Sequence, residues 1–388
     1  MKLLVVLSRV PWPLDKGDKL RAYYQIKYLS KNHEIELIAL NDKELHPDAE
    51  RELSKYCKAI HIFSLKRPGI ALHIAAAFFK GKPLQVGYFY DAGIHRKIKE
   101  IIRRFQPDHI YGQLVRVAEY IRHESIPKTL DYQDALSAGM QRRAQKASGV
   151  NAQLFWAEYR RLRRYEAAVF EDFDYKTIIT VQDRDLIQHS DKKQIHIVPN
   201  GVDTDFFHPV EAEKKYDLVF TGNMSYPPNV GAARFLVKEI LPLVHKEMPE
   251  VNVLIAGASP APAVKALAGA KVEVSGWMDD IREAYASSRI FVAPMQIGTG
   301  LQNKLLEAMA MKIPAVTSKL ANKALQARPG EYIRVASEDK PEQFAGQILD
   351  LLQKPSRAEE QKEKAYLFVK ENYSWEAAIK KLEQLWGN

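Results

Sequence analysis

Residues 298–314 read Gly-Thr-Gly-Leu-Gln-Asn-Lys-Leu-Leu-Glu-Ala-Met-Ala-Met-Lys-Ile-Pro, and they are the most informative part of the sequence. An apolar run ending at Met295 leads into a glycine-bracketed turn and then a helix, whose N-terminus can receive an anion such as a pyrophosphate. Lys304 adds a cation there. Glu307 lies on the same side of the helix, where a carboxylate can accept both hydroxyls of a ribose. An ordinary i,i+3 pair between Lys304 and Glu307 is the alternative.

The same alternation of apolar run, turn and helix extends along the whole chain, and it restarts after Tyr216. Strands are expected at 2–7, 34–40, 59–62, 109–111, 128–131, 177–181, 195–198, 217–221, 251–256, 271–275, 290–293 and 315–317. Helices are expected at 20–31, 94–105, 141–174, 229–245, 281–286, 302–311, 341–353, 357–371 and 374–385. This pattern is typical of an α/β protein with parallel sheets covered by helices on both faces.

The length of 388 residues suits two domains rather than one. A turn signal at Pro199-Asn200-Gly201 marks the linker. We therefore predict an N-terminal Rossmann-like domain over 1–200 and a C-terminal one over 201–370, facing each other across a cleft. A last helix, 371–388, is expected to pack back toward the first domain.

Composition narrows the class of protein. A single cysteine, Cys57, excludes a disulfide framework and a cysteine-rich metal site, and it fits a cytoplasmic protein. The histidines show no metal-ligand spacing. No run of 18 apolar residues suggests a membrane span, and the apolar piece 70–79 is too short for one.

The charge of the chain is uneven. Residues 1–195 carry 34 Lys and Arg against 24 Asp and Glu, whereas the remainder carries 23 against 24. The basic cluster Arg160–Arg164 follows the aromatic residues Phe155, Trp156 and Tyr159 on one helix. A solvated face is the favoured interpretation, and peripheral contact with anionic lipid at the inner face of the membrane stays open. Nucleic acid is not an expected partner, because no recognition module is present.

Several motifs together carry a family resemblance. They are Pro199–Asp203, Phe220–Met224, Ile255–Gly257, Ser275–Trp277 and Glu307–Val316. With the glycine-bracketed turn, they resemble glycosyltransferase family 4, a group of retaining enzymes with the GT-B architecture. The resemblance spans nearly the whole chain and is strongest over 198–317.

The resemblance implies a donor site for a nucleoside diphosphate sugar. Glu307 would hold the ribose, while Lys304 and the amides of Gly300–Asn303 would meet the diphosphate. Gly276 would lie near the base, with Trp277 beside it, although packing is the favoured role for Trp277. The implied donor-binding residues are Gly222, Asn223, Gly276, Gly298, Thr299, Gly300, Leu301, Gln302, Asn303, Lys304 and Glu307.

The sequence departs from the family pattern at three places. Thr299 replaces the first of two glutamates that stand eight residues apart. Asn229 and Val230 replace a basic pair after the Gly222 loop, so Lys304 is a candidate to supply the missing cation. Gln133 occupies the position of a frequent histidine in the N-terminal domain.

Two regions of the N-terminal domain are candidates for the acceptor side. In the loop after the first strand, Gly17, Asp18 and Arg21 could meet phosphate or an anionic acceptor, or Asp18 could merely cap a helix. After the strand at 128–131, Asp131 and Asp134 are the candidate catalytic carboxylates, which could orient the acceptor hydroxyl or take its proton. A helix cap is again the alternative for Asp134.

The predicted activity is transfer of a sugar from a nucleoside diphosphate sugar to an acceptor hydroxyl, with retention, in polysaccharide or glycolipid synthesis. The implied partners are the donor and a saccharide or lipid-linked acceptor. No metal and no cofactor is expected, since amides and Lys304 could stabilise the leaving diphosphate. The alternative is a non-catalytic nucleotide-sugar-binding partner in a polysaccharide-assembly complex.

Overall fold

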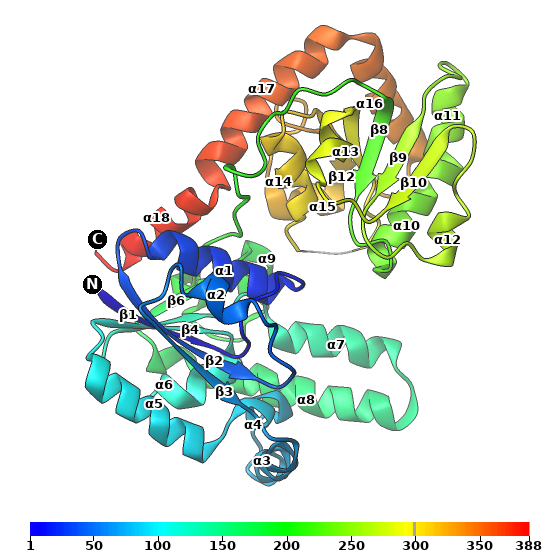
Figure 1. The fold of residues 1–388 in the computed structure, drawn as a ribbon. Helices are drawn as coiled ribbons and strands as arrows, with labels where there is room; N and C mark the ends of the chain where they lie inside the picture. The colour runs from blue at the N-terminus through cyan, green and yellow to red at the C-terminus, as the bar shows by residue number, and fades with distance from the viewer. Residues whose placement is uncertain (298–299, 388) are drawn as a thin grey trace. The chain divides into compact units, whose positions relative to one another are not determined.

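The computed structural model describes residues 1–297 and 300–387, so the predicted donor residues Gly298 and Thr299 lie outside the described residues. The chain divides into two compact units (Figure 1). The first contains Met1–Pro199 and resumes at Ile379, and the second contains Asn200–Ala378. Each unit has its own parallel sheet and its own hydrophobic core, which confirms the predicted α/β class.

The sheet of the first unit has the strand order β3-β2-β1-β4-β5-β6-β7. Its strands are β1 (Lys2–Leu7), β2 (Glu34–Asn41), β3 (Ala59–Ser64), β4 (His109–Gln113), β5 (Lys128–Asp131), β6 (Tyr175–Ile178) and β7 (His196–Ile197). Strand β1 lies between β2 and β4, with Leu3 opposite Ile35 on one side and His109 on the other. Such central parallel strands are buried on both faces, which explains their continuous apolar sequence.

The helices of the first unit are α1 (Gly17–Leu29), α2 (Ala49–Leu53), α3 (Arg67–Phe79), α4 (Leu84–Phe89), α5 (Ala92–Phe105), α6 (Ala118–Ile121), α7 (Leu136–Lys146), α8 (Gly149–Ala168) and α9 (Val181–Leu186). Helix α5 illustrates how they form. Its N-cap Asp91 accepts a hydrogen bond from the Ile94 amide, and its buried face includes Ile98 and Ile102. The cap and the helical spacing of the apolar residues together account for this helix.

Two boundaries in the first unit differ from the sequence prediction. The expected helix 141–174 is two helices, α7 and α8, which lie side by side as a hairpin (Figure 1). The first helix ends at Lys146, and Gly149, the first residue of α8, has a φ of 60°, a left-handed conformation that allows the chain to turn between the two helices. The expected strand 177–181 stops at Ile178, because Thr180 caps α9 through the Asp183 amide.

The sheet of the second unit has the order β10-β9-β8-β11-β12-β13. Its strands are β8 (Tyr216–Thr221), β9 (Val253–Ala256), β10 (Val272–Gly276), β11 (Ser288–Ala293), β12 (Ala315–Ser318) and β13 (Arg334–Ala336). Its helices are α10 (Pro227–Phe235), α11 (Leu241–His245), α12 (Pro262–Lys265), α13 (Arg282–Ala286), α14 (Asn303–Ala310), α15 (Lys319–Leu325), α16 (Pro341–Gln353), α17 (Pro355–Asn372) and the first turn of α18 (Trp375–Leu385). The short strand β13 was not expected.

From Ile379 onward, α18 belongs to the first unit. His33 Nε2 and Glu383 Oε1 lie 2.9 Å apart, and the Trp386 indole donates to Thr129 Oγ1 at 2.8 Å. The Trp386 ring also lies 4.6 Å from that of His109, centroid to centroid. Among residues 1–297 and 300–387, none of the helices combines the length and the apolar character that crossing a bilayer requires.

Candidate functional site

Two glycines at the carboxyl ends of β8 and β9 shape the candidate donor site of the second unit. Gly222 follows β8 with a φ of 152°, and Gly257 follows β9 with a φ of 132°. A Cβ atom on Gly257 would lie 2.0 Å from the Gly222 carbonyl oxygen, so the two backbones meet where no side chain fits. In open α/β sheets, this edge is where ligands bind.

Lys304, in the first turn of α14, points toward this glycine edge. Its Nζ donates to Oδ1 of Asn229 and lies 4.8 Å above the Phe220 ring. A Cβ on Gly222 would come within 3.2 Å of the same Nζ. Burial lowers the pKa of Lys304 to about 8, although Glu307 acts in the opposite direction. Within residues 1–297 and 300–387, no carboxylate is in hydrogen-bonding contact with this half-buried ammonium, which favours an anionic ligand.

Glu307 lies one turn further along α14. Its Oε2 accepts a 2.7 Å hydrogen bond from the Tyr285 hydroxyl, which is also 2.7 Å from Thr221 Oγ1. Burial raises the pKa of Glu307, while Tyr285 and Lys304 act against that rise. Within the described residues, no hydrogen bond reaches its other oxygen, Oε1. The carboxylate is therefore held in place by one oxygen while the other can accept hydroxyl groups.

The structure does not show the ordinary i,i+3 ion pair that was the alternative interpretation of Lys304 and Glu307. These two described residues form no ion pair: the ammonium bonds Asn229 and the carboxylate bonds Tyr285. The helix that carries them begins at Asn303 and, within the described residues, has no side-chain cap. Its first amides are therefore available to an anion.

The other predicted donor residues have mixed surroundings. Asn223 uses its side-chain oxygen locally, accepting from the Ser225 amide and hydroxyl. Gly276 ends β10 with a φ of 74°, and its carbonyl accepts from the Gly257 amide at 2.9 Å. Gly300 has open space around its Cα, and Leu301 and Gln302 are partly exposed at the start of α14.

The structure corrects the expected role of Trp277. Packing was its favoured role, but 73% of its surface is exposed, so it is not a core residue. Its indole donates to Asp279 at 3.3 Å. The ring is thus presented on the surface next to Gly276, at the carboxyl end of β10, where a nucleotide base could stack on it.

The structure also corrects the roles predicted for Asp131 and Arg21. Neither has exposed side-chain surface, and the Arg21 Nε lies 2.6 Å from Asp131 Oδ2. Asp131 is the last residue of β5, and its other donors are the Tyr111 hydroxyl, Gln25, the Thr177 hydroxyl and the Gln133 amide. The Asp131 carboxylate is enclosed and hydrogen-bonded on all sides, so it cannot contact an acceptor in this conformation. Arg21 cannot meet an anionic acceptor for the same reason.

Asp134 has the opposite environment. It is exposed and lines a pocket of about 560 Å³ in the first unit. Although part of the residue is exposed at the pocket, surrounding protein shields the carboxyl group from much of the solvent; this shielding and the nearby Asp183 raise its pKa to about 6, against the effect of Arg116 and Arg142. Helix α7 begins at Leu136 with Ala135 as its N-cap, and among the described residues its Ser137 amide donates to Glu166 Oε1 at 3.0 Å, not to Asp134. The alternative role of Asp134 as a helix cap is therefore wrong.

The pocket around Asp134 contains three arginines. They are Arg9, Arg116 and Arg143. Arg9 and Arg116 lie 5.9 and 5.3 Å from the centroid of the Phe89 ring. The Arg116 guanidinium donates to the neutral Gln85 oxygen, and its burial beside two other arginines lowers its pKa to about 10. No sequence pattern marked Arg116, because the fold alone brings it to this pocket.

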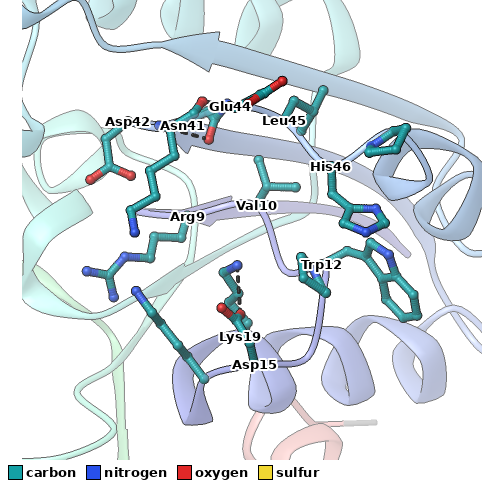
Figure 2. Close-up of a pocket in the computed structure, with 14 residues that line it drawn as sticks. Arg9, Val10, Trp12, Asp15, Lys19, Asn41, Asp42, Glu44, Leu45 and His46 are labelled. Carbon is teal, nitrogen blue, oxygen red and sulfur yellow. Dashed lines mark hydrogen bonds and ion pairs between the residues drawn. The ribbon is translucent and has the colours of Figure 1, made fainter.

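A neighbouring pocket of about 370 Å³ lies at the ends of β1 and β2 (Figure 2). It shares Arg9 and Asp42 with the first pocket, and Figure 2 shows Lys19 directed toward Asp15. Asp18, at the start of α1, binds Arg9 at 2.6 Å, while Gly17 has open space around its Cα. Asp18 therefore orients a pocket residue rather than capping α1.

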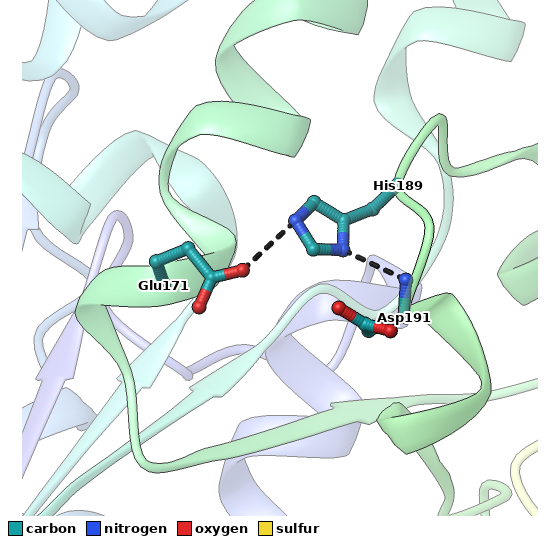
Figure 3. Close-up of side chains that lie close together, drawn as sticks. All are labelled: Glu171, His189 and Asp191. Carbon is teal, nitrogen blue, oxygen red and sulfur yellow. Dashed lines mark hydrogen bonds and ion pairs between the residues drawn. The ribbon is translucent and has the colours of Figure 1, made fainter.

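One trio of side chains in the described part of the first unit has the composition of a metal site (Figure 3). His189 Nε2 lies 3.0 Å from Glu171 Oε1, and His189 Nδ1 accepts from the Asp191 amide. The His189 ring also stacks on Phe170 at 3.8 Å. An ion pair, a hydrogen bond and a stacked ring account for this arrangement, so no metal is assigned to it.

Comparison with known proteins finds a family match within the second unit and one similar protein of nearly the same length. Residues 215–354 match the family model described as "Glycosyl transferases group 1". A relative named "Uncharacterized 44.6 kDa protein in cps region", from Klebsiella pneumoniae, is 22% identical over 400 residues, covering 96% of each chain.

Solved structures with the same fold cover the whole chain. HepE from Anabaena in complex with UDP has a TM-score of 0.70 at 12% identity, and each chain is covered completely. Sucrose-phosphate synthase from Thermosynechococcus elongatus has a TM-score of 0.68 at 15% identity, covering 100% of this chain and 98% of that one. TarM has a TM-score of 0.69 at 11% identity, covering 100% and 99%. The fold is therefore the GT-B fold, and the match to the group 1 glycosyl transferase model lies within the second unit.

Proposed function

We propose that the protein is a glycosyltransferase that moves a sugar from a nucleoside diphosphate sugar to an acceptor hydroxyl. The observation that carries the proposal is the separation of Lys304 and Glu307. Each is held by a different neighbour, on one face of a helix that begins at the glycine edge. An ammonium beside helix amides suits a diphosphate, and a carboxylate one turn away suits a ribose.

In this proposal the leaving diphosphate gains negative charge as the glycosidic bond breaks. Lys304 and the first amides of α14 would stabilise that charge without needing a metal. Asn229 stands where the family has a basic residue, and Lys304 reaches that position from the other side of the site. This contact supports Lys304 as the substitute for the missing cation. Retention at the anomeric carbon, as in glycosyltransferase family 4, is part of the same proposal.

The acceptor would bind in the first unit, in the pocket that contains Asp134. A carboxylate with a pKa of about 6 is deprotonated at neutral pH and is a stronger base than an ordinary aspartate. The three arginines beside it favour an acceptor that carries phosphate or carboxylate groups. A glycolipid or polysaccharide intermediate fits this chemistry. The cps-region name of the Klebsiella pneumoniae relative supports a role in the synthesis of such molecules.

The experiment that tests the donor site is calorimetric titration with nucleosides and nucleoside diphosphates, after a thermal-shift screen has found the preferred base. Lys304→Met should weaken diphosphate binding about 10- to 100-fold, as expected for one hydrogen bond to a charged group, and should leave nucleoside binding almost unchanged. Lys238→Ala removes an exposed cation of the same unit and serves as the control. Equal losses for nucleoside and diphosphate would contradict the phosphate role of Lys304.

A non-catalytic nucleotide-sugar-binding partner is the second candidate, because Thr299 and Gln133 depart from the family pattern. Transfer from the preferred donor to any acceptor in a broad screen would exclude it. Tight donor binding without transfer or donor hydrolysis would favour it.

A further inference from the structure

Helix α3 is an unusual surface of the first unit, because it is apolar and exposed along one whole side. Of its thirteen described residues, Arg67–Phe79, only Ala77 is buried. Leu72 is 71% exposed, Phe78 50% and Phe79 86%. A helix that stabilised the unit by packing would bury such side chains, so this face is suited to a contact outside the chain.

The exposed apolar residues lie on one side of α3. Pro68, Leu72, Ala75 and Phe79 follow the spacing i, i+4, i+7, i+11, which places them in one stripe. The opposite side packs closely on α4, since a Cβ on Gly87 would lie 2.4 Å from the Ala77 Cβ. The helix is thus attached to the unit along one side and presents leucine and phenylalanine along the other.

Charge identifies what the stripe would contact. Lys66 and Arg67 lie at the start of α3 and Lys80 at its end; all three are exposed, and within the described residues none of them forms an ion pair. No residue of α3 is acidic. Arg161 of α8 adds a further cation, 4.4 Å above the Phe78 ring. Apolar side chains between cations match an anionic lipid surface, into which the rings insert while the cations meet headgroups.

The length of α3 excludes a spanning role. Thirteen residues extend about 20 Å, which is shorter than the roughly 30 Å hydrocarbon core of a bilayer. We infer that α3 lies flat in the headgroup region of an anionic bilayer, with Leu72, Phe78 and Phe79 inserted. This contact differs from the Arg160–Arg164 cluster considered from the sequence, because the apolar side chains come from α3.

The inner side of α3 connects the proposed membrane contact with the candidate acceptor pocket. Ile74 lines the pocket that contains Asp134, together with Met140 and Phe89. A helix docked on a membrane would hold this partly apolar pocket close to the lipid headgroups. If the proposed function is correct, the acceptor is then lipid-linked, with its phosphate near the arginines and its hydroxyl near Asp134.

Co-sedimentation of the full chain with vesicles tests the inference. Vesicles of phosphatidylcholine with one-third phosphatidylglycerol should bind the wild type, pure phosphatidylcholine should bind it at least tenfold more weakly, and 0.5 M salt should reduce binding. Leu72→Ser with Phe79→Ser should lower binding at least tenfold without lowering the melting temperature, because both side chains are exposed. Leu367→Ser, at a 53% exposed leucine of α17, is the matched control and should bind like the wild type.

Several results would overturn the inference. Wild-type binding by the double variant would show that α3 does not insert, and absence of binding to anionic vesicles would show that the stripe has another occupant. A dimer in light scattering that the double variant abolishes would identify that occupant as a second copy. Nucleoside diphosphate binding should be the same in both variants, so a failure at the membrane leaves the donor site testable by itself.

Discussion

Replacement of Asp131 by asparagine separates a structural role from a catalytic one. In the wild type, the Asp131 carboxylate is fully buried and neutralises the fully buried Arg21 guanidinium. Asparagine keeps the shape but removes the charge, so the guanidinium stays buried and uncompensated. Removing one partner of a buried ion pair costs about 3–5 kcal/mol.

A loss of that size should lower the melting temperature of the first unit by roughly 10 °C, because 1 kcal/mol corresponds to about 2–4 °C in a domain of this size. Differential scanning calorimetry measures it, and the transition of the second unit serves as an internal reference. Asp134→Asn is the matched control two residues away. Its carboxylate is exposed and has a raised pKa, so its loss should leave the melting temperature unchanged or slightly higher.

Transfer activity provides a second measurement on the Asp131→Asn and Asp134→Asn variants. Asp131→Asn protein that is folded at low temperature should retain most of its transfer activity, whereas Asp134→Asn should lose it. Replacing both members of the ion pair, Arg21→Met with Asp131→Leu, should recover much of the stability, because no charge is then left unpaired. A wild-type melting temperature together with lost turnover in Asp131→Asn would refute this assignment and restore Asp131 as a catalytic residue.

Three further predictions follow from the site geometry. Transfer activity should fall as the pH drops through about 6, because protonation of Asp134 removes the base, and the kcat/KM profile of Asp134→Asn should lack that step. Nucleoside diphosphate affinity should fall as the pH rises through and above about 8, because Lys304 then loses its proton, and a flat calorimetric profile up to pH 10 would argue against that role. Gly257→Ala should lower the free energy of unfolding, measured by urea denaturation, by several kcal/mol, because its Cβ would meet the Gly222 oxygen at 2.0 Å. Gly231→Ala, in open space on α10, is the control and should be neutral or stabilising by up to about 1 kcal/mol. Equal effects of the two substitutions would contradict the close approach of the two backbones.

The parts of the fold that the sequence predicts best are those in which burial determines the sequence. Strands such as β1 and β8 are central in parallel sheets, so their apolar runs are continuous and their positions agree closely with expectation. Strand β13 has three residues, too few to show a pattern. Helix α3 has no polar face for periodicity to detect, because its apolar residues are exposed as well as buried.

The candidate site likewise contains residues that the sequence could indicate and residues that only the tertiary fold reveals. The turn and helix that carry Lys304 and Glu307 are contiguous in sequence, so the family resemblance could be followed there residue by residue, whereas residue types and spacing alone left an ordinary i,i+3 pair open. Tyr285 holds Glu307 from 22 residues away, and no local pattern marks it. Asp131 and Asp134 look equivalent in sequence, but Asp131 ends a buried strand while Asp134 lines a pocket. Burial separates them, and burial depends on the tertiary fold.

The central claim is that Glu307 and Lys304 hold a nucleoside diphosphate, and titration of Glu307→Ala tests it most directly. The nucleoside diphosphate that binds the wild type most tightly, from a screen that includes UDP and GDP, is the ligand. Tyr285 keeps Thr221 as a partner, so the fold should survive, and Glu239→Ala at an exposed position is the control. We predict affinity about 10- to 100-fold weaker than wild type, the loss expected from hydrogen bonds to a charged group. Wild-type affinity in folded Glu307→Ala would contradict the account.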